Sequence, residues 1–436
     1  MTDSALNIDY FQKKAEQILS PKAHGTLQEV TGLTLKCKGP WGNIGDICTI
    51  RTSAGDEVFA EIVGFKADCS LLMPLGDIKN IGPGCEVKNF GHPLTVKVSD
   101  KLLGRVLDGL GNPLDGKGPI YTDSEYPTVN EPPSPLKRPR IKQPLSVGVK
   151  PIDGLLTMGK GQRMGIFAGS GVGKSTLLGM VSRNTKADIN VIALIGERGR
   201  EVMDFIERDL GEEGLKRSVV IVATSDQPPL VRLKGAFVAT SIAEYFRDQK
   251  KDVMLLMDSV TRFAMAQREI GLSLGEPPTT RGYTPSVFTL LPKLFERSGT
   301  SELGSITGIY TVLVDGDDFN EPVTDAVRGI LDGHIILSRD IASQNHYPAI
   351  DILNSVSRVM GEVVDDEHKE LAANLRKVLG NYKKAEDLIN IGAYKKGSNN
   401  DIDEAIEKNG RIMNFLKQSV DSKYSLSDSV ELLKEI

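Results

Sequence analysis

A short glycine-rich segment, Ala168-Gly-Ser-Gly-Val-Gly-Lys-Ser175, holds the residues with the plainest chemical meaning in the chain. It follows the apolar run RMGIFAG and opens the helix-like sequence STLLGMVSR, the strand-loop-helix context of a phosphate-binding P-loop. The glycines let successive backbone N–H groups curl around phosphate oxygens, and the helix dipole adds positive potential there. One position departs from the motif, because Ala168 stands where a P-loop has glycine and its Cβ restricts the backbone torsions.

Two residues at the end of this segment are expected to act on a bound triphosphate. Lys174 can neutralise charge on the β- and γ-phosphates, and the Ser175 hydroxyl can bind Mg²⁺. ATP and Mg²⁺ are therefore the expected ligands. The predicted nucleotide-binding residues of the segment are Gly169, Ser170, Gly171, Val172, Gly173, Lys174, Ser175 and Thr176.

Acidic residues follow two other apolar runs. Asp258 ends the run VMLLMD and so lies at the carboxyl edge of a buried strand, where it can hold Mg²⁺ through water. Glu197 follows the run NVIALIG, and burial beside phosphates can tune such a carboxylate for polarising water. Spacing alone leaves Glu197, Glu201 and simple salt-bridge formation as equal interpretations of this segment. Three arginines are candidate cations that composition does not rank: Arg198, Arg262 and Arg358.

The elements that must position these residues fall into distinct regions of the chain. Apolar runs joined by helix-length connections predict an α/β domain with a parallel sheet over 96–360, which includes a proline-rich linker at 120–144. Short runs rich in Val, Ile and Thr, spaced by turns, predict a small β-barrel over 21–95. Apolar residues at helical spacing predict an amphipathic helix over 1–20 and a helical domain over 361–436.

Composition narrows the class of protein. The 436 residues carry a net charge of −5 and few aromatic side chains, which argues against a protein that binds nucleic acid. No window offers 18 or more consecutive apolar residues, and the amino terminus lacks the pattern of a secretory signal. The 4 cysteines form no CxxC pair, which predicts free thiols in a reducing cytosol, and the 5 histidines lack metal-ligand spacing.

Several long segments together resemble the type III export ATPases, which are relatives of the rotary ATP synthase catalytic subunit. They are GSGVGKST, LIGERGREV, GLSLGEPPTTRGYTPSVF, GSITGIYTVLVDGDDFNEP and NHYPAIDILNSVSRVM, and the similarity covers nearly the whole chain. The flagellum-specific branch is the nearest match. The injectisome ATPases remain the alternative, and a rotary catalytic subunit is disfavoured by the linker and the GLSLGEPPTTRGYTPSVF segment.

The resemblance implies a role for each matching residue. Lys174 matches the residue that binds phosphate, and Ser175 matches the residue that binds Mg²⁺. Glu197 matches the catalytic glutamate and Arg198 follows it as in the family, while Asp258 matches the magnesium aspartate. Tyr347, in HYPAID, matches the tyrosine that packs on adenine. Arg358, in SVSR, matches the arginine finger that reaches a neighbour's γ-phosphate. The predicted catalytic set is Lys174, Glu197, Arg198, Asp258 and Arg358, with Ser175 and Asp258 as the metal ligands.

The resemblance also implies an assembly and a set of partners. Because Glu197 and Arg358 occur in one polypeptide, a homohexamer could supply both sides of every interface. The implied fold is a RecA-like core between a barrel and a helical domain. The implied activity is Mg-ATP hydrolysis that energises unfolding, chaperone release and export of flagellar subunits.

The implied partners act at the inner face of the cell membrane at the flagellar base, with the protein cytoplasmic and peripherally attached. They are a regulator that binds the N-terminal helix, export gate and stalk proteins, and chaperone–substrate complexes, but no nucleic acid. A helix that packs locally is the alternative for the N-terminal segment. For the whole chain, the alternatives from another class are a hexameric nucleic-acid motor and a ring that binds nucleotide without hydrolysis.

Overall fold

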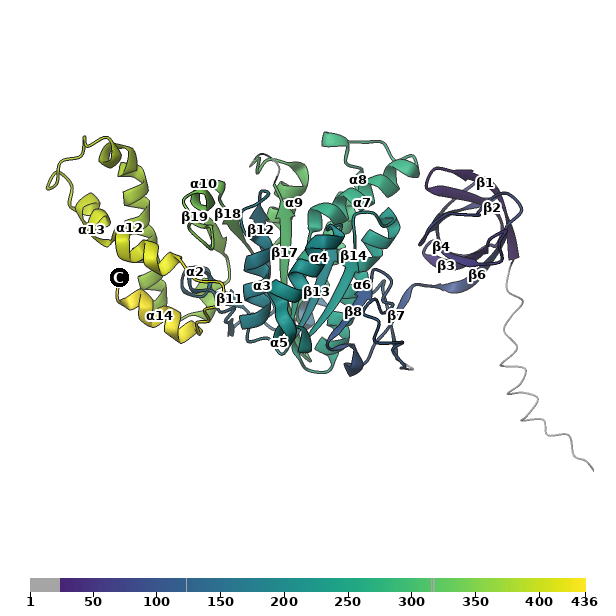
Figure 1. Cartoon of the computed structure of the whole chain (residues 1–436), viewed down its shortest axis with the longest axis horizontal. Coiled ribbons are helices and arrows are strands. Elements are labelled where there is room, and N and C mark those ends of the chain that lie inside the picture. The colour runs from purple at the N-terminus through teal and green to yellow at the C-terminus, as the bar shows by residue number, and fades with distance from the viewer. Residues whose placement is uncertain (1–23, 123, 315, 317) are drawn as a thin grey trace, which may run out of the picture. The chain divides into compact units, whose positions relative to one another are not determined.

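The computed structural model describes residues 24–122, 124–314, 316 and 318–436, which form two compact units (Figure 1). The first unit ends at Leu94, and the second runs from Thr95 to Ile436. The helix expected over 1–20 lies outside the described residues.

The first unit, over its described residues, is a closed barrel of six antiparallel strands in the order β1-β2-β5-β4-β3-β6. Alternate residues of these strands point inward, so that side chains such as Leu35, Ile50 and Leu72 fill the interior. All four cysteines lie in this unit as free thiols. The strands are β1 (His24–Thr31), β2 (Thr34–Lys38), β3 (Asp46–Arg51), β4 (Glu57–Lys66), β5 (Cys69–Pro74) and β6 (Glu86–Pro93).

The second unit is built on one sheet, in which its described residues contribute nine strands. The order along the sheet is β19-β18-β12-β17-β15-β13-β14-β8, and β16 pairs with β17. β18–β19 and β16–β17 are antiparallel, and the other neighbours are parallel. The strands are β8 (Arg105–Asp108), β12 (Arg163–Ala168), β13 (Ile189–Ile195), β14 (Ser218–Ala223), β15 (Asp252–Asp258), β16 (Gly299–Thr300), β17 (Ser305–Leu313), β18 (Gly333–Leu337) and β19 (Ile350–Ser357).

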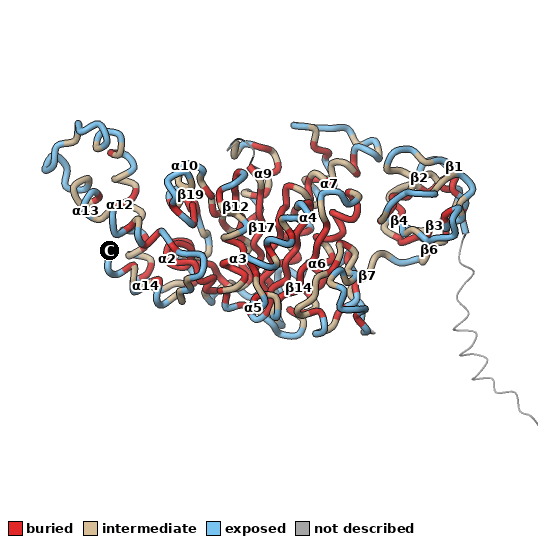
Figure 2. The backbone as a smooth tube through the Cα atoms, viewed as in Figure 1, coloured by how far each residue is buried: buried red, intermediate tan, exposed pale blue. Residues whose placement is uncertain are grey.

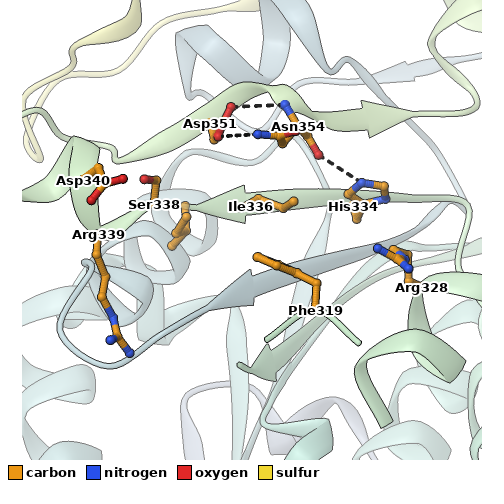
Figure 3. Close-up of a pocket in the computed structure, with 10 residues that line it drawn as sticks. Phe319, Arg328, His334, Ile336, Ser338, Arg339, Asp340, Asp351 and Asn354 are labelled. Atoms are coloured by element: carbon orange, nitrogen blue, oxygen red, sulfur yellow. Dashed lines mark hydrogen bonds between the residues drawn. The ribbon is translucent and has the colours of Figure 1, made fainter. Parts of the chain in front are cut away.

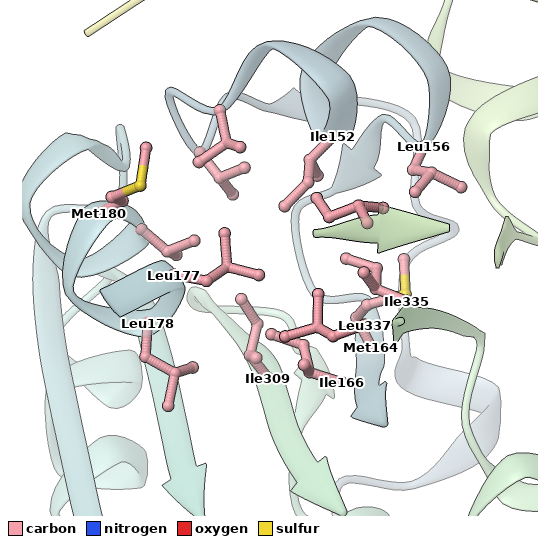
Figure 4. Packing of buried hydrophobic residues seen from close by; sticks show 14 of the residues in the cluster. Ile152, Leu156, Met164, Ile166, Leu177, Leu178, Met180, Ile309, Ile335 and Leu337 are labelled. Atoms are coloured by element: carbon pink, nitrogen blue, oxygen red, sulfur yellow. The ribbon is translucent and has the colours of Figure 1, made fainter. Parts of the chain in front are cut away.

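Helices cover both faces of this sheet, which explains why strands such as β13 and β14 are buried at every position (Figure 2). On one face, Leu177 and Met180 of the helix after β12 pack with Ile166, Ile309 and Leu337 of the strands (Figure 4). The helices are α2 (Lys150–Leu155), α3 (Lys174–Asn184), α4 (Gly199–Asp204), the π-helix η3 (Phe205–Leu210), α5 (Gly211–Lys216), α6 (Pro229–Asp248), α7 (Val260–Ser273), α8 (Pro285–Phe295), α9 (Pro322–Ile330) and α10 (Arg339–Ser343). On the other face, α6 and α7 pack against β13, β15 and β17.

The remaining helices follow the last strand and share its core. They pack against α2 and β19, and Leu375 and Phe415 belong to the same buried cluster as the sheet residues. Because the cluster is continuous, the division at 360 and 361 stays a prediction. Among the described residues, no helix combines the length and apolar character needed to cross a membrane. These helices are α11 (Met360–Val363), α12 (Asp366–Asn390), α13 (Asn400–Leu416) and α14 (Leu426–Lys434).

The proline-rich segment lies on the second unit and is held there by a buried ion pair. Arg297 of the core binds Glu244 of α6 at 2.7 Å, and its Nη1 donates to the Thr128 carbonyl at 2.7 Å. Asn130 also donates to Glu244, at 3.0 Å. The buried charges are thus paired and hydrogen bonded, as their burial requires. The short elements near this segment are β7 (Thr95–Lys97), η1 (Asp100–Leu102), β9 (Glu125–Pro127), η2 (Pro135–Lys137), β10 (Pro144–Leu145) and β11 (Met158–Gly159), and η4 (Thr280–Gly282) lies between α7 and α8.

Candidate functional site

The P-loop lies between β12 and α3, as the sequence predicts. Gly171 and Gly173 have φ angles of 79° and 87°, a region that a residue with a Cβ rarely adopts. Val172 between them is buried in the core and anchors the loop. Ala168 is the last residue of β12, and its carbonyl accepts from Val314 N at 3.0 Å. The departure at the first motif position therefore costs nothing, because that residue is in a strand.

Three charged residues meet beside this loop. The Lys174 ammonium contacts the Asp258 carboxylate and lies 3.3 Å from Glu197 Oε1. β13 and β15 are parallel neighbours, with Leu194 opposite Asp258, so their carboxyl ends bring Glu197 and Asp258 to one edge. The Thr311 hydroxyl of β17 donates to Asp258 Oδ1 at 2.7 Å and orients that carboxylate.

Burial shifts the protonation of the cluster. The pKa of Glu197 is raised to about 7, first by burial and then by the charge of Asp258, against the opposing effect of Lys174. Burial works against the charge on Lys174, but the two carboxylates outweigh it and raise the pKa of its ammonium. Glu197 is thus a carboxylate that can exchange a proton near neutral pH beside a fixed positive charge.

The other acidic and basic candidates of the GERGREV segment lie at the surface. Glu201 and Arg198 pair at 3.4 Å, with side chains 43% and 67% exposed, whereas the Glu197 side chain is 15% exposed. Of the three interpretations that the sequence leaves open for this segment, the structure places Glu197 in the charged cluster and Glu201 in an exposed salt bridge with Arg198, where the Glu201 side chain also hydrogen bonds with that of Glu197. Arg198 is not brought into the cluster.

Arg262 is a cation that the sequence names without a role. It lies in the first turn of α7, directly after β15, and its side chain packs so closely on Gly196 that a Cβ there would approach within 2.6 Å. Its Nε is buried and has no hydrogen-bond partner among the described residues. Gly196, on which the Arg262 side chain packs, directly precedes Glu197. Buried unpaired donors are rare, so a ligand at this place is the natural partner.

The ring of Tyr347 lies next to the P-loop at Gly173. A Cβ on Gly173 would lie 3.3 Å from the Tyr347 ring, which is 39% exposed. The Tyr347 carbonyl accepts from Gln418 N at 3.0 Å, in the loop between α13 and α14. A cavity of about 410 Å³ is lined here by Asn345, Tyr347, Lys417, Gln418, Ser419 and Val420. Nothing in the sequence pattern points to the residues from Lys417 to Val420, because they follow the P-loop by more than 200 positions.

Arg358 and the charged cluster lie at opposite ends of the strands, on two edges that we call the Arg358 edge and the P-loop edge. β18 runs parallel to β12 and reaches the P-loop edge at Leu337, whereas the antiparallel β19 returns and ends beside Gly333. These four residue steps span about 13 Å. Arg358 follows β19 and is exposed, and its Nη2 donates to the Arg328 carbonyl at 3.4 Å. The structure therefore does not bring Arg358 to the charged cluster of its own chain.

A cavity of about 520 Å³ occupies the face of β18 and β19 between these two edges (Figure 3). Arg339 borders it next to the P-loop, where a Cβ on Gly169 would lie 2.7 Å from its guanidinium. Arg328 and His334 also border it, and the Arg328 carbonyl is the one that accepts from Arg358. The cavity thus separates the P-loop edge from the Arg358 edge on this face of the sheet.

Comparison with known proteins identifies the family. The nucleotide-binding domain of the ATP synthase alpha/beta family matches residues 148–357, its beta-barrel domain matches 27–91, and the T3SS EscN ATPase C-terminal domain matches 364–435. The chain is 55% identical to the flagellum-specific ATP synthase of Bacillus subtilis (strain 168), with 96% of each chain covered. The chain belongs to this family of flagellar and type III secretion ATPases.

Two further family members agree with this assignment. The type 3 secretion system ATPase of Xanthomonas euvesicatoria is 50% identical, over 95% of this chain and 94% of its own. The structure of assembled EscN with its central stalk EscO, from enteropathogenic E. coli, has a TM-score of 0.88 at 46% identity, covering 94% of this chain and 99% of that one. The predicted resemblance and the predicted barrel, P-loop core and helical domain are confirmed, and the chain is an ATPase of this family.

Proposed function

We propose that the protein hydrolyses Mg-ATP to drive type III protein export at the bacterial flagellum. The observation that carries the chemistry is the cluster of Lys174, Glu197 and Asp258 at the P-loop. The 55% identity to a flagellum-specific relative favours flagellar export. Injectisome export is the second candidate, because a type 3 secretion relative is 50% identical and would use the same site.

The P-loop binds the triphosphate through its backbone N–H groups and through Lys174. Without nucleotide, the ammonium is held by two carboxylates, and the phosphates offer it a stronger and better-hydrogen-bonded counter-charge. The unpaired Nε of Arg262 adds a second donor on the side of Glu197. Tyr347 packs on the adenine, with the segment from Lys417 to Val420 closing its cavity.

The donor set at this edge fits Mg²⁺. Asp258 is almost fully buried at a strand end and is oriented by Thr311, and Ser175 offers an exposed hydroxyl in the first turn of α3. Oxygen donors of this kind are the ones that Mg²⁺ prefers. Ser175 and, through water, Asp258 would hold Mg²⁺, which would neutralise phosphate charge when bound.

Glu197 orients and deprotonates the attacking water. Its carboxylate lies beside Lys174 yet is raised in pKa, so it can take a proton at neutral pH. Arg198, exposed at the start of α4 and paired with Glu201, contributes positive charge at the surface beside Glu197. The transition state gathers negative charge on the γ-phosphoryl group, and Lys174 is positioned to stabilise it.

The remaining cation is supplied in trans. Because Arg358 lies across the sheet from its own cluster, it serves the P-loop of a neighbouring copy in a homohexameric ring. The relative EscN is described as an assembled ATPase with a central stalk, which supports a ring that turns about or grips a stalk protein.

The wider partners follow from the family. We propose contacts with an export regulator through residues 1–20, with the export gate, and with chaperone–substrate complexes through the C-terminal helices, in a cytoplasmic protein peripheral to the membrane at the flagellar base. Deleting residues 1–18 is expected to leave nucleotide binding intact and to remove regulator binding in a pull-down. Retained regulator binding would instead favour local packing of that segment.

Two measurements test the function. Steady-state Mg-ATPase activity is expected for the parental chain and not for Lys174→Ala, and added RNA is expected to leave it unchanged. Deleting the gene in its host separates the two export systems: loss of flagellar filaments supports the proposal, and loss of injectisome secretion with normal filaments supports the alternative.

A further inference from the structure

A fully buried glutamine, Gln162, lies behind Arg358 at the start of β12. Its side chain has no exposed area, and all of its polar groups are hydrogen bonded. Oε1 accepts from Gly159 N at 2.9 Å, and Nε2 donates to the Asp332 carbonyl at 3.1 Å and to Ser357 Oγ at 3.0 Å. These last two partners are separated from Gln162 by 170 and 195 positions in the sequence.

Both partners of the Gln162 amide hold the backbone of Arg358. The Asp332 carbonyl also accepts from Arg358 N at 3.0 Å. Ser357 directly precedes Arg358, and its hydroxyl donates onward to the Thr157 carbonyl at 2.9 Å. Gln162 therefore links the two groups that fix the Arg358 backbone: the carbonyl that binds its N–H and the side chain of the residue before it.

The anchor on the Asp332 side is itself rigid. The Asp332 carboxylate accepts from Arg163 N at 3.0 Å and pairs with the Arg163 guanidinium at 3.1 Å, and Asp332 N donates to the Arg163 carbonyl at 2.9 Å. Gln162 and Arg163 are consecutive, so two neighbouring side chains grip one aspartate by its carbonyl and by its carboxylate. The Arg163 pair is further held by Glu296 at 2.5 Å.

The Arg358 side chain, in contrast, is exposed, and its Nη2 contact to the Arg328 carbonyl is long at 3.4 Å. The direction of the Arg358 side chain is therefore set by its backbone and not by contacts with neighbouring side chains. A group that must reach a reacting phosphate needs such preorganisation, since a displacement of about 1 Å can cost about 100-fold in rate.

We infer that Gln162 is a positioning residue for Arg358, and so acts on the active site of the neighbouring copy and not on its own. This inference rests on the proposed role of Arg358 in trans. It adds that a buried amide links the groups that hold the end of β19, although β12, which Gln162 directly precedes, carries the P-loop of the same chain at its other end.

The test uses the full-length chain and Gln162→Leu, which keeps the volume and removes the amide. Alone, this variant is expected to lose roughly 10- to 100-fold in kcat while its KM for ATP stays within about threefold, because its own P-loop is untouched. Ser357→Ala removes one link of the anchor at a partly exposed position, and a smaller loss in the same direction is expected.

Mixing experiments then locate the defect. In one-to-one mixtures with Lys174→Ala, about a quarter of the interfaces pair an intact P-loop from Gln162→Leu with a well-aimed Arg358, so activity is expected to recover. In mixtures with Arg358→Ala, no interface gains a well-aimed arginine, and no recovery is expected. If Gln162→Leu instead damages the P-loop of its own chain, activity recovers with Arg358→Ala and not with Lys174→Ala. A general loss of stability favours neither mixing partner.

A matched control is Asn190→Leu. Asn190 is equally buried and donates to the Ser182 carbonyl at 2.9 Å and to Ser218 Oγ at 3.2 Å, far along the sheet from Arg358. Any loss from weakened folding is expected to be the same with either mixing partner.

The outcomes separate this inference from the function beneath it. Recovery of Gln162→Leu with Arg358→Ala, or unchanged kcat in both Gln162→Leu and Ser357→Ala, overturns the positioning role while leaving Arg358 in trans intact. If Gln162→Leu does not fold, the same two mixtures with Ser357→Ala decide the matter. Failure of the Lys174→Ala and Arg358→Ala pair to recover in a mixture overturns the trans role itself.

Discussion

The two edges of the nucleotide-binding sheet hold their functional residues in opposite ways. At the P-loop edge, Asp258 is buried, Lys174 and Glu197 are largely buried, and Lys174 binds both carboxylates, so the charged side chains are held before any nucleotide arrives. At the other edge, Arg358 has an exposed side chain on a backbone that buried groups hold in place. The first edge is therefore arranged to bind a ligand within the chain, whereas the second exposes an arginine that can reach a ligand outside it.

Under the proposed function, this difference makes a single chain an incomplete enzyme. β19 begins shortly after Tyr347, at the P-loop edge, and ends at Ser357, just before Arg358 and about 13 Å along the strands from that edge. Under the proposed function, a single strand would therefore lead from the adenine side of one site to the cation of another. The comparison predicts that variants at the first edge damage the subunit's own site and that variants at the second damage a neighbour's.

The largest effect is expected from Lys174→Ala. Removing the ammonium leaves Glu197 and Asp258 facing each other without a counter-charge, and it leaves the developing phosphate charge unneutralised. Hydrolysis is expected to fall to background in a steady-state Mg-ATPase assay. Near-normal turnover would contradict the P-loop assignment.

A loss of roughly 1000-fold is expected from Arg358→Ala, which is the usual contribution of an arginine finger. Because the substituted side chain is exposed and remote from its own P-loop, ATP affinity is expected to stay unchanged by equilibrium binding. The specific activity of the parental chain is expected to rise with protein concentration as rings assemble. A parental rate for Arg358→Ala would show that Arg358 is not needed for hydrolysis.

Glu197→Gln is expected to separate binding from chemistry at the first edge. The amide keeps the shape of the side chain but cannot take a proton from water, so hydrolysis is expected to fall by about 100-fold or more. ATP affinity is expected to remain within about tenfold, because the phosphate contacts of the loop persist. An affinity loss equal to the rate loss would make Glu197 a binding residue and return Glu201 to consideration.

The smallest effect concerns pH. The pKa of Glu197 is raised to about 7, and the base must be ionised to act, so kcat/KM is expected to fall about tenfold per unit as pH drops below that value. Lys174 does not titrate in this range, because the two carboxylates raise its pKa. A profile measured from pH 5.5 to 9 that is flat for the parental chain would remove Glu197 as the base.

Local patterns predicted the P-loop and Asp258 at the first edge, left Glu197 and Glu201 as equal candidates there, and did not rank Arg358 at the second. The P-loop, Glu197 and Asp258 each follow an apolar run, and parallel strands bring such ends together whatever the details of packing. Gln162 carries no such signal, because its partners Asp332 and Ser357 are brought to it by strand order alone. Gln418, which donates to the Tyr347 carbonyl, carries no such signal either, because the packing of the C-terminal helices places it there.

Two expectations depended on the context in which a residue sits. Ala168 departs from the motif without consequence, because the strand continues through it. Arg262 could be named but not ranked, since only the packing on Gly196 shows that its Nε is buried and unpaired. Charge and spacing identify such residues, but burial decides which of them needs a ligand.

The most direct test of the division between the two edges mixes Lys174→Ala with Arg358→Ala. Each protein is expected to be inactive alone, and in a one-to-one mixture about a quarter of the interfaces join an intact P-loop to an intact arginine. The account predicts that activity reappears on mixing, up to roughly that fraction of the parental rate if the sites act independently. A mixture in which both proteins enter the same rings and hydrolysis stays at background would contradict it, because Arg358 would then not complete the site of a neighbouring chain.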